Sequence, residues 1–237
     1  MGAVGGLPHE TWATSSRRTR AHRSWTPLGR ALAATGDRWT LLIVLQLSGG
    51  RLRLSRLHRC LPGVSTGVLE RYVQQMEELE LLTRTRHREM PPRVELELTQ
   101  AGRELLPIAV ALSRWGMVRM WSDPGERERV GIELLLRTLP MLVEDPAELP
   151  DGTVEAVVVD HPEPPTHVSY RICGGHIQVE HATGRSQSRV EGNTGMWIEA
   201  LGPAADYARL TFEGERQLAI ALLDALPRST RSVPRVG

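Results

Sequence analysis

The stretch RLSRLHRCLPGVSTGVLERYVQQMEEL, residues 53–79, decides how the front of this chain folds. Leucines recur at helical spacing in its first part, and Pro62-Gly63 then predicts a turn. Ser65 or Thr66 can cap the longer helix that follows, because either hydroxyl can accept a hydrogen bond from a free backbone N–H group. The apolar stripe predicted for that helix comprises Val68, Tyr72, Met76 and Leu79. The stretch therefore predicts a short helix, a tight turn and a longer amphipathic helix.

The residues on either side of this stretch complete an order of elements. Hydrophobic spacing predicts helices over residues 28–34 and 39–47, and strands over residues 83–86 and 93–98. Asp37 is positioned to cap the second of these helices, and Thr99 caps another helix after the second strand. Helix, short helix, turn, longer helix and two-stranded hairpin is the order of a winged helix-turn-helix.

The second half of the chain predicts a different unit, which begins after Asp123-Pro124-Gly125. Its predicted elements are helices over 130–142, 194–201 and 217–226, and strands over 153–159, 168–173, 176–181, 189–191 and 210–213. Gly174-Gly175 is a two-residue hairpin loop, and such a loop fixes how its strands pair. The predicted pairs are Ile172 with Ile177, Tyr170 with Val179 and Val168 with His181 on an apolar face, and Arg171 with Gln178 and Ser169 with Glu180 on a polar face.

Charge is distributed unevenly, although the formal net charge is only +1. Residues 1–60 hold ten Arg against Glu10 and Asp37, whereas residues 123–237 hold eleven Arg against eighteen acids. A basic front of this kind favours a polyanionic partner, and the alternative is a merely solvated basic surface. All 29 basic residues are arginine, a bias that a GC-rich genome could produce as well as selection for phosphate binding.

Composition excludes several classes of protein. Only Cys60 and Cys173 occur, so a disulfide framework and a cysteine-rich zinc ribbon are excluded. No stretch reaches the roughly 18 apolar residues that span a bilayer, and residues 1–23 lack the apolar core of a secretory signal. We therefore expect a cytoplasmic protein that does not bind membranes.

Polar and basic side chains of the helix-turn-helix and the hairpin suit nucleic-acid binding. Short or forked polar groups at the start of a recognition helix can reach base edges, and arginines on the preceding helix and the hairpin can contact phosphates. The candidate DNA-binding residues are Arg53, Arg56, Ser65, Thr66, Arg71, Gln75, Arg84, Arg86, His87, Arg88 and Arg93.

Five short motifs in the front half carry a resemblance to a known family. They are DRWTLLI at 37–43, LPGVS at 61–65, VLER at 68–71, EMPPRVE at 89–95 and LTQAGR at 98–103. Over residues 27–116 the chain resembles HxlR-type winged-helix transcription regulators, and the wing motif is specific. The resemblance implies a homodimer that binds a two-fold-related double-stranded DNA operator. It also implies that the first helix and the long helix after the wing form the dimer interface.

Three positions depart from the pattern of that family. Thr26 stands where the family usually has a cysteine, sometimes redox-active, which excludes thiol sensing at that position. Thr66 and Gly67 replace a common proline and lysine at the start of the recognition helix, so the operator sequence does not follow from relatives. Cys60 stands where a small residue is common, and we interpret it as a packing residue rather than a sensor.

The rear half is similar to the sterol carrier protein type 2-like domain in the hairpin over 170–179, the helix over 194–201 and the sequence LTFEG at 210–214. That resemblance implies an α/β layer around an apolar cavity that takes a lipid-like or polyketide-like molecule. The candidate lining residues are Leu135, Leu139, Tyr170, Ile172, Val179, Trp197, Phe212, Leu218 and Leu222. The alternative is that these side chains form a filled core, as apolar strand faces usually do.

We therefore expect an α+β chain with two domains. A winged helix domain for DNA binding and dimerisation is predicted over residues 24–122, and a layered α/β domain over 127–226, between a flexible basic tail over 1–23 and a second tail over 227–237. The leading hypothesis is a homodimeric DNA-binding regulator that responds to a small apolar effector. The alternative is a lipid or small-molecule carrier whose winged helix serves dimerisation or protein contact.

An enzyme is not expected from the motifs of this chain. No glycine-rich phosphate loop follows a predicted strand, and no H-E-x-x-H motif occurs. His176 and His181 are separated by an odd number of residues and so face opposite sides of a strand, which disfavours a zinc site. We predict no catalytic residue, no cofactor and no metal.

Overall fold

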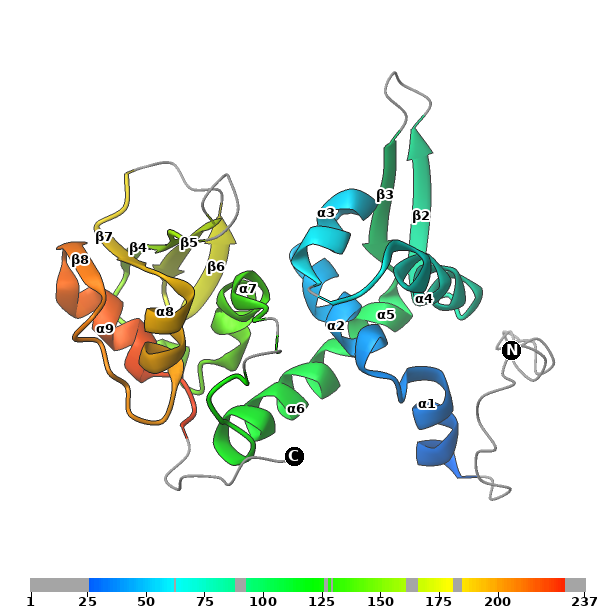
Figure 1. The fold of residues 1–237 in the computed structure, drawn as a ribbon, viewed down its shortest axis with the longest axis horizontal. Coiled ribbons are helices and arrows are strands. Elements are labelled where there is room, and N and C mark those ends of the chain that lie inside the picture. The colour runs from blue at the N-terminus through cyan, green and yellow to red at the C-terminus, as the bar shows by residue number, and fades with distance from the viewer. Residues whose placement is uncertain are drawn as a thin grey trace, which may run out of the picture.

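The computed structural model describes residues 26–61, 63–87, 93–125, 128, 130–160, 166–180 and 185–228. The predictions that fall outside these ranges concern the tails 1–23 and 229–237, Pro62, Arg88, the wing residues 89–92 and His181. Figure 1 shows a front unit with a projecting hairpin and a rear unit built on a sheet, joined by a long helix. No helix in the described part of the chain is long and apolar enough to cross a membrane.

The front unit has the order of elements that the sequence predicts (Figure 1). Its helices are α1 (Pro27–Thr35), α2 (Arg38–Leu47), α3 (Leu54–Cys60), α4 (Thr66–Glu78), α5 (Gln100–Glu104) and α6 (Leu106–Arg119). Its strands are β1 (Leu52–Arg53), β2 (Leu82–His87) and β3 (Arg93–Leu98), in the antiparallel order β1-β3-β2. Sequence spacing does not predict β1, because two residues are too few for a periodic signal.

Side-chain caps fix where three of these helices begin. Asp37 Oδ1 accepts hydrogen bonds from the backbone N–H groups of Trp39 and Thr40, at 2.8 and 2.9 Å. Ser65 caps α4 and Thr99 caps α5 in the same way. Each cap satisfies an N–H group that has no partner within its helix, so the predicted helix starts are confirmed.

Helix α4 buries a different stripe from the predicted one. Its buried side chains are Leu69, Val73 and Met76. Of the predicted stripe only Met76 is buried, whereas Val68, Tyr72 and Leu79 are half-buried. Both α2 and β2 pack against α4, and its buried face is rotated from the predicted one toward Leu69 and Val73. Neighbouring residues are about 100° apart around a helix, and because the two stripes share Met76, the predicted stripe was wrong by less than one such step.

The rear unit is a five-stranded sheet with three helices packed on it (Figure 1). The helices are α7 (Ile132–Leu142), α8 (Thr194–Leu201) and α9 (Arg216–Asp224), with a 3₁₀ turn over Pro146–Glu148. The strands are β4 (Gly152–Val158), β5 (Thr166–Cys173), β6 (His176–Glu180), β7 (Ser188–Gly192) and β8 (Thr211–Gly214). Their order is β6-β5-β4-β7-β8, with β4 and β7 parallel and the other neighbours antiparallel. Helices and sheets together confirm the α+β class.

The β5–β6 hairpin has the predicted register. The confirmed pairs are Ile172 with Ile177, Tyr170 with Val179, Arg171 with Gln178 and Ser169 with Glu180. The loop residues Gly174 and Gly175 have φ angles of 55° and 77°. A side chain disfavours this left-handed region, and two successive positive φ angles suit the twist of a two-residue hairpin.

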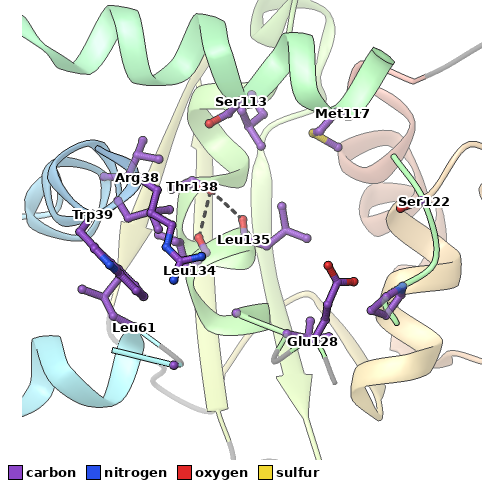
Figure 2. A pocket seen from close by; sticks show the side chains of 17 residues that line it. Arg38, Trp39, Leu61, Ser113, Met117, Ser122, Glu128, Leu134, Leu135 and Thr138 are labelled. Carbon is purple, nitrogen blue, oxygen red and sulfur yellow. Dashed lines mark hydrogen bonds between the residues drawn. The ribbon is translucent and has the colours of Figure 1, made fainter. Parts of the chain in front are cut away.

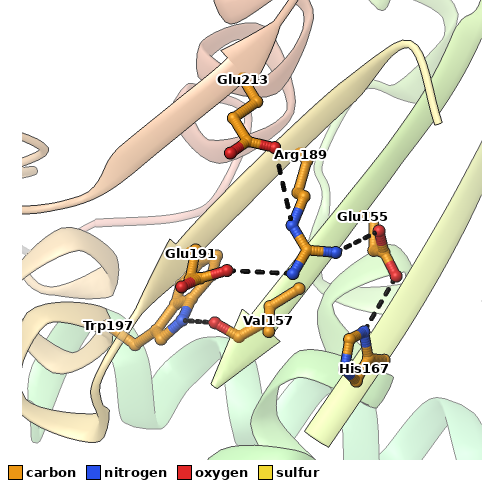
Figure 3. Close-up of polar contacts among 7 residues, drawn as sticks. All are labelled: Glu155, Val157, His167, Arg189, Glu191, Trp197 and Glu213. Atoms are coloured by element: carbon orange, nitrogen blue, oxygen red, sulfur yellow. Dashed lines mark hydrogen bonds and ion pairs between the residues drawn. The ribbon is translucent and has the colours of Figure 1, made fainter. Parts of the chain in front are cut away.

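The outer face of the rear sheet carries a charged cluster (Figure 3). Glu155 on the central strand β4 is almost fully buried, and its carboxylate lies 3.0 Å from a guanidinium nitrogen of Arg189 and 3.0 Å from His167 Nδ1. Arg189 also reaches Glu191 at 2.9 Å and Glu213 at 3.9 Å. A buried carboxylate has lost its water and needs such partners. The rear unit thus neutralises this charge from within its own sheet.

Helix α6 joins the two units. It begins in the front unit, whereas Met117 near its end is buried in the rear core. Arg114 donates hydrogen bonds from Nη2 to the carbonyl oxygens of Met141 and Val143, at 2.9 and 2.7 Å, where α7 ends. The rear core therefore starts within α6, ahead of the boundary predicted at residue 122.

Candidate nucleic-acid interface

Helix α4 presents polar side chains at its exposed start. Ser65, Thr66 and Arg71 are exposed, and Gln75 is half-buried. Ser65 Oγ accepts a hydrogen bond from the Val68 N–H group at 3.4 Å, which holds the first turn in place. The four side chains predicted to reach base edges thus lie on one helix that is open to solvent at its start.

Residues 63–67 read GVSTG and match the G-x-S-x-G pattern of hydrolases. In a nucleophile elbow the serine lies between a strand and a helix. Here α3 precedes the turn, and Ser65 Oγ is occupied as the cap of α4. The pattern therefore belongs to the turn of a helix-turn-helix and does not mark a nucleophile.

His58 braces the turn between α3 and α4. Its Nε2 lies 3.1 Å from the Val64 carbonyl oxygen and 3.5 Å from Thr66 Oγ1. The ring thereby connects α3 to the first residue of α4 and fixes how that helix leaves the turn. Sequence reasoning misses this residue, because one histidine on a short helix gives no spacing signal.

Two of the arginines predicted to bind DNA are engaged within the protein. Arg84 is 11% exposed and pairs with Glu70 at 3.2 Å and Glu77 at 3.4 Å, so it ties the wing strand β2 to α4. Arg56 pairs with Glu133 of α7 and links α3 to the rear unit. Each arginine would have to give up a carboxylate before it contacted a phosphate.

Unlike Arg56 and Arg84, three other predicted arginines have exposed side chains: Arg53, Arg71 and Arg86. Within the described ranges no carboxylate lies at ion-pair distance from any of these three side chains. The Arg71 guanidinium stacks over the Tyr72 ring at 5.4 Å from its centre, which restrains the long side chain. These arginines offer the interface positive charge that no carboxylate in the described ranges neutralises.

Near the loop end of the β2–β3 hairpin, Glu95 contacts two further predicted residues. His87 Nε2 lies 3.2 Å from Glu95 Oε2, and Arg93 Nε lies 3.7 Å from Glu95 Oε1. The positive charge of Arg93 is therefore partly neutralised by this carboxylate, whereas Arg86 keeps its charge exposed.

Large apolar side chains are exposed along α1 and α6. Leu28, Leu32, Ile108, Leu112 and Trp115 are each more than half exposed. Their spacing of three or four residues places those of each helix on one helical face. Apolar stripes of this kind are typical of surfaces that contact another protein. They lie on the two helices that the family resemblance assigns to the dimer interface.

Most of the predicted ligand-lining residues pack into the rear core. Leu139, Tyr170, Ile172, Trp197, Leu218 and Leu222 are buried, Leu135 and Phe212 are partly buried, and Val179 is exposed. The Tyr170 hydroxyl donates to the Leu136 carbonyl at 2.8 Å, and the Trp197 indole N–H donates to the Val157 carbonyl at 2.9 Å (Figure 3). Their polar groups are satisfied inside the fold, so this packing favours a filled core.

Cys60 is buried on α3, whereas Cys173 is exposed on β5. Burial, together with the nearby Glu133 carboxylate, raises the pKa of the Cys60 thiol to about 11. The thiol is therefore protonated at neutral pH, and a protonated thiol is a poor nucleophile. This environment favours a packing role for Cys60.

Thr26, which stands where the family usually has a cysteine, caps α1. Its Oγ1 accepts a hydrogen bond from the Gly29 N–H group at 3.0 Å.

Comparison with known proteins matches residues 34–124 to the HxlR-like helix-turn-helix family. An uncharacterized HTH-type transcriptional regulator of Methanothermobacter thermautotrophicus is 36% identical over 86 residues, or 36% of this chain and 66% of that protein. The HTH-type regulator sll1512 of Synechocystis is 33% identical over 46% of this chain and 77% of its own length. For YvaP of Bacillus subtilis the identity is 35%, over 40% of this chain and 86% of that protein. The family match begins at the end of α1 and ends before α7, so it covers the front unit from α2 to α6 and leaves the rear unit outside it.

Proposed function

We propose that this chain, which belongs to the HxlR-like helix-turn-helix family, is a homodimeric transcriptional regulator that binds a specific double-stranded DNA operator. The observation that carries the proposal is the exposed start of α4, where Ser65, Thr66 and Arg71 lie with the free charges of Arg53 and Arg86 on neighbouring elements. Relatives named as HTH-type transcriptional regulators support this function over an enzymatic one. We expect the protein in the cytoplasm, where operator DNA is accessible.

Helix α4 enters the major groove in this proposal. Arg71 has the forked geometry that recognises guanine, and Gln75 can bind adenine through its amide group. Ser65 and Thr66 contact a base edge or the adjacent phosphate. Because α4 is amphipathic, with Leu69, Val73 and Met76 held in the core, its outer face is free to follow the groove.

Phosphate contacts position the unit on the duplex. Arg53 at the start of α3 and Arg86 on the wing carry exposed charge, and we assign Arg88 to the same role by its place in the wing sequence. The candidates Arg56, Arg84, His87 and Arg93 take part only where a phosphate replaces the carboxylate that each now contacts. Phosphate binding releases counterions, so operator affinity should fall steeply with salt.

Dimerisation through α1 and α6 covers the apolar stripes. A face that includes Leu32, Leu112 and Trp115 is costly to leave in water, and a second copy of the same face is complementary to it in a two-fold arrangement. Such a dimer presents two α4 helices to successive major grooves. The operator should then contain two half-sites whose centres are about 10 base pairs apart, or a multiple of that distance.

We also propose that a small apolar effector controls this dimer. An effector shifts the population toward or away from the DNA-competent arrangement only when it binds one arrangement more tightly. The alternative function, a lipid carrier, requires open space inside the rear unit. Because Tyr170 and Trp197 are buried there and bonded to the backbone, the packing favours the regulator.

Selection from a random duplex library tests operator binding and dimerisation together. The wild-type protein should enrich a sequence with two-fold symmetry, whereas a protein with Arg71→Ala should lose preference at one position in each half-site. Enrichment of a single unrepeated site would contradict the homodimer. Failure to enrich any sequence would contradict operator binding.

A further inference from the structure

A cavity of about 810 Å³ lies between the two units (Figure 2). Its apolar wall comes from Trp39 and Leu42 of α2, Met117 of α6, and Leu134 and Leu135 of α7. The volume falls within the range of cavities that hold small organic ligands, roughly 300–1,000 Å³. Of the residues predicted to line a ligand cavity, Leu135 is placed here, at the junction of the units rather than inside the rear core.

Arg38 lines this cavity, and no acidic residue in the described ranges neutralises its charge. The Arg38 guanidinium lies over the Trp39 ring, 4.6 Å from its centre, and is drawn toward the interior in Figure 2. Within the described ranges no carboxylate is at ion-pair distance from Arg38. The neighbouring Asp37 is occupied, since its oxygens accept from Trp39 N–H, Thr40 N–H and Thr40 Oγ1. Arg38 can therefore take an acid group from a ligand.

A carboxylate lies on another wall of the same cavity. Glu128 belongs to the segment between α6 and α7, and its Oε2 accepts a hydrogen bond from the Gly125 N–H group at 2.7 Å. In Figure 2 its side chain is well separated from Arg38. Its negative charge disfavours a second acid on the ligand, so the two charges together select a molecule with one anionic end.

We propose that this interdomain cavity binds a small amphipathic monoanion, with its acid group on Arg38 and its apolar body against the leucines of α2 and α7, and that this molecule, apolar except for its one acid group, is the effector. The effector role rests on the proposed function, whereas the binding itself does not. The ring of Trp39 stacks against the guanidinium and offers an apolar surface to the adjoining part of the ligand.

The position of the cavity couples its occupant to the DNA-binding unit. One wall is α2, which packs against α4, and another is α7, which begins the rear unit. The Arg56–Glu133 ion pair joins α3 to α7 across the same junction. A ligand that fits one spacing of α2 and α7 better than another therefore biases how the rear unit holds the helix-turn-helix.

Two fluorescent probes that differ by one charge test the site on the full chain. 1-Anilinonaphthalene-8-sulfonate carries a sulfonate, and N-phenyl-1-naphthylamine has the same apolar body without it. The variant Arg38→Gln should weaken sulfonate probe binding about tenfold, the typical worth of a charge-assisted contact, and leave the neutral probe unchanged. Arg216→Gln is the matched control, because Arg216 also stacks on an aromatic ring, Phe212 at 4.8 Å, but lies in the rear unit away from the cavity. Leu135→Trp, which narrows the apolar part of the cavity, should weaken binding of both probes.

The outcomes separate the site from the function. If Arg38→Gln and Leu135→Trp bind both probes as the wild type does, the cavity is not the site. If the sulfonate probe binds through Arg38 but leaves operator affinity unchanged in the wild type, the effector role fails. If the wild type binds no operator while probe binding still depends on Arg38, the proposed function fails and the binding site stands.

Discussion

The front and rear units differ in whether their charged and apolar side chains find partners within the fold. In the front unit Arg53, Arg71 and Arg86 have no described acid at ion-pair distance, and Trp115 is one of several large apolar side chains open to solvent. In the rear unit the buried carboxylate of Glu155 is neutralised by its own sheet.

This difference indicates which unit makes contacts with other molecules. Charged groups that a fold pairs internally are satisfied, and each loses that partner if it binds elsewhere. The free energy falls when DNA covers exposed cations or when a second copy of the chain covers an apolar stripe. The rear unit exposes only scattered valines among its described large apolar residues, Val159 and Val179. We therefore expect the proposed operator binding and dimerisation to take place through the front unit.

The largest expected effect comes from breaking the apolar stripe. Trp115→Glu places a charge in the middle of the proposed dimer face, and we expect a monomer whose operator affinity falls by at least about 100-fold, since one half-site alone remains. Analytical ultracentrifugation and DNA titration measure the two effects. Val159→Glu, at an exposed apolar residue of the rear unit, should change neither, and a dimer that survives Trp115→Glu would refute this interface.

The next effect comes from unpairing a charge in the rear unit. Arg189→Ala leaves the carboxylate of Glu155 buried with only His167 beside it, and we expect a loss of about 2 kcal/mol in the free energy of unfolding. Urea unfolding measures it. Arg171→Ala removes an exposed partner of Glu180 and should leave the stability unchanged within error. Equal losses from the two variants would show that burial of Glu155 does not matter.

Arg71→Ala should act on recognition and not on folding. Loss of one base contact costs about 1–3 kcal/mol, so operator affinity should fall roughly tenfold or more, with relaxed preference at one position of each half-site. The free energy of unfolding should stay within about 0.5 kcal/mol of the wild type, as for other exposed positions. Arg216→Ala provides the control for loss of a stacked arginine. An unchanged affinity would remove Arg71 from the interface.

A smaller effect is expected from Arg53→Gln. If Arg53 contacts a phosphate, the slope of log affinity against log salt should decrease by about one, with little change in sequence preference. Arg51→Gln is the nearby control, because Arg51 already pairs with Glu97 at 2.6 Å. Salt-dependent titrations compare the two variants. A slope that changes for Arg51 and not for Arg53 would reverse their roles.

Thiol reactivity gives the smallest signal. In the folded protein at pH 8 only Cys173 should react with a disulfide reagent, because with a pKa of about 11 the Cys60 thiol is about one-thousandth ionised and is buried as well. Cys173→Ser should therefore abolish rapid labelling, and the unfolded chain should regain one reactive thiol. Rapid labelling of folded Cys173→Ser would contradict a packing role for Cys60.

Local features of this fold are predictable from sequence because local physics fixes them. The caps Asp37 and Thr99 and the glycines of the β5–β6 loop decide where elements begin and how strands pair, and these predictions are confirmed. The stripe of α4 was predicted less than one residue step around the helix from the buried one, since adjacent stripes of a helix have similar spacing and only the neighbours α2 and β2 choose between them.

Long-range partners limit what sequence can say about the site. Arg56 and Arg84 look like free phosphate contacts until Glu133 and Glu70 are found beside them, 77 and 14 residues away along the chain. The cavity at Arg38 is likewise a product of how α2, α6 and α7 meet, which no spacing within one element encodes.

The most direct test of operator binding by the front unit is a fluorescence anisotropy titration at several salt concentrations. The wild-type chain is titrated onto the duplex recovered by selection and onto a scrambled duplex of the same composition. We expect at least about 10³-fold tighter binding to the selected duplex, with affinity that falls steeply as salt rises. Equal affinity for the two duplexes, or no binding to either at low salt, would contradict the assignment of this chain as a DNA-binding regulator.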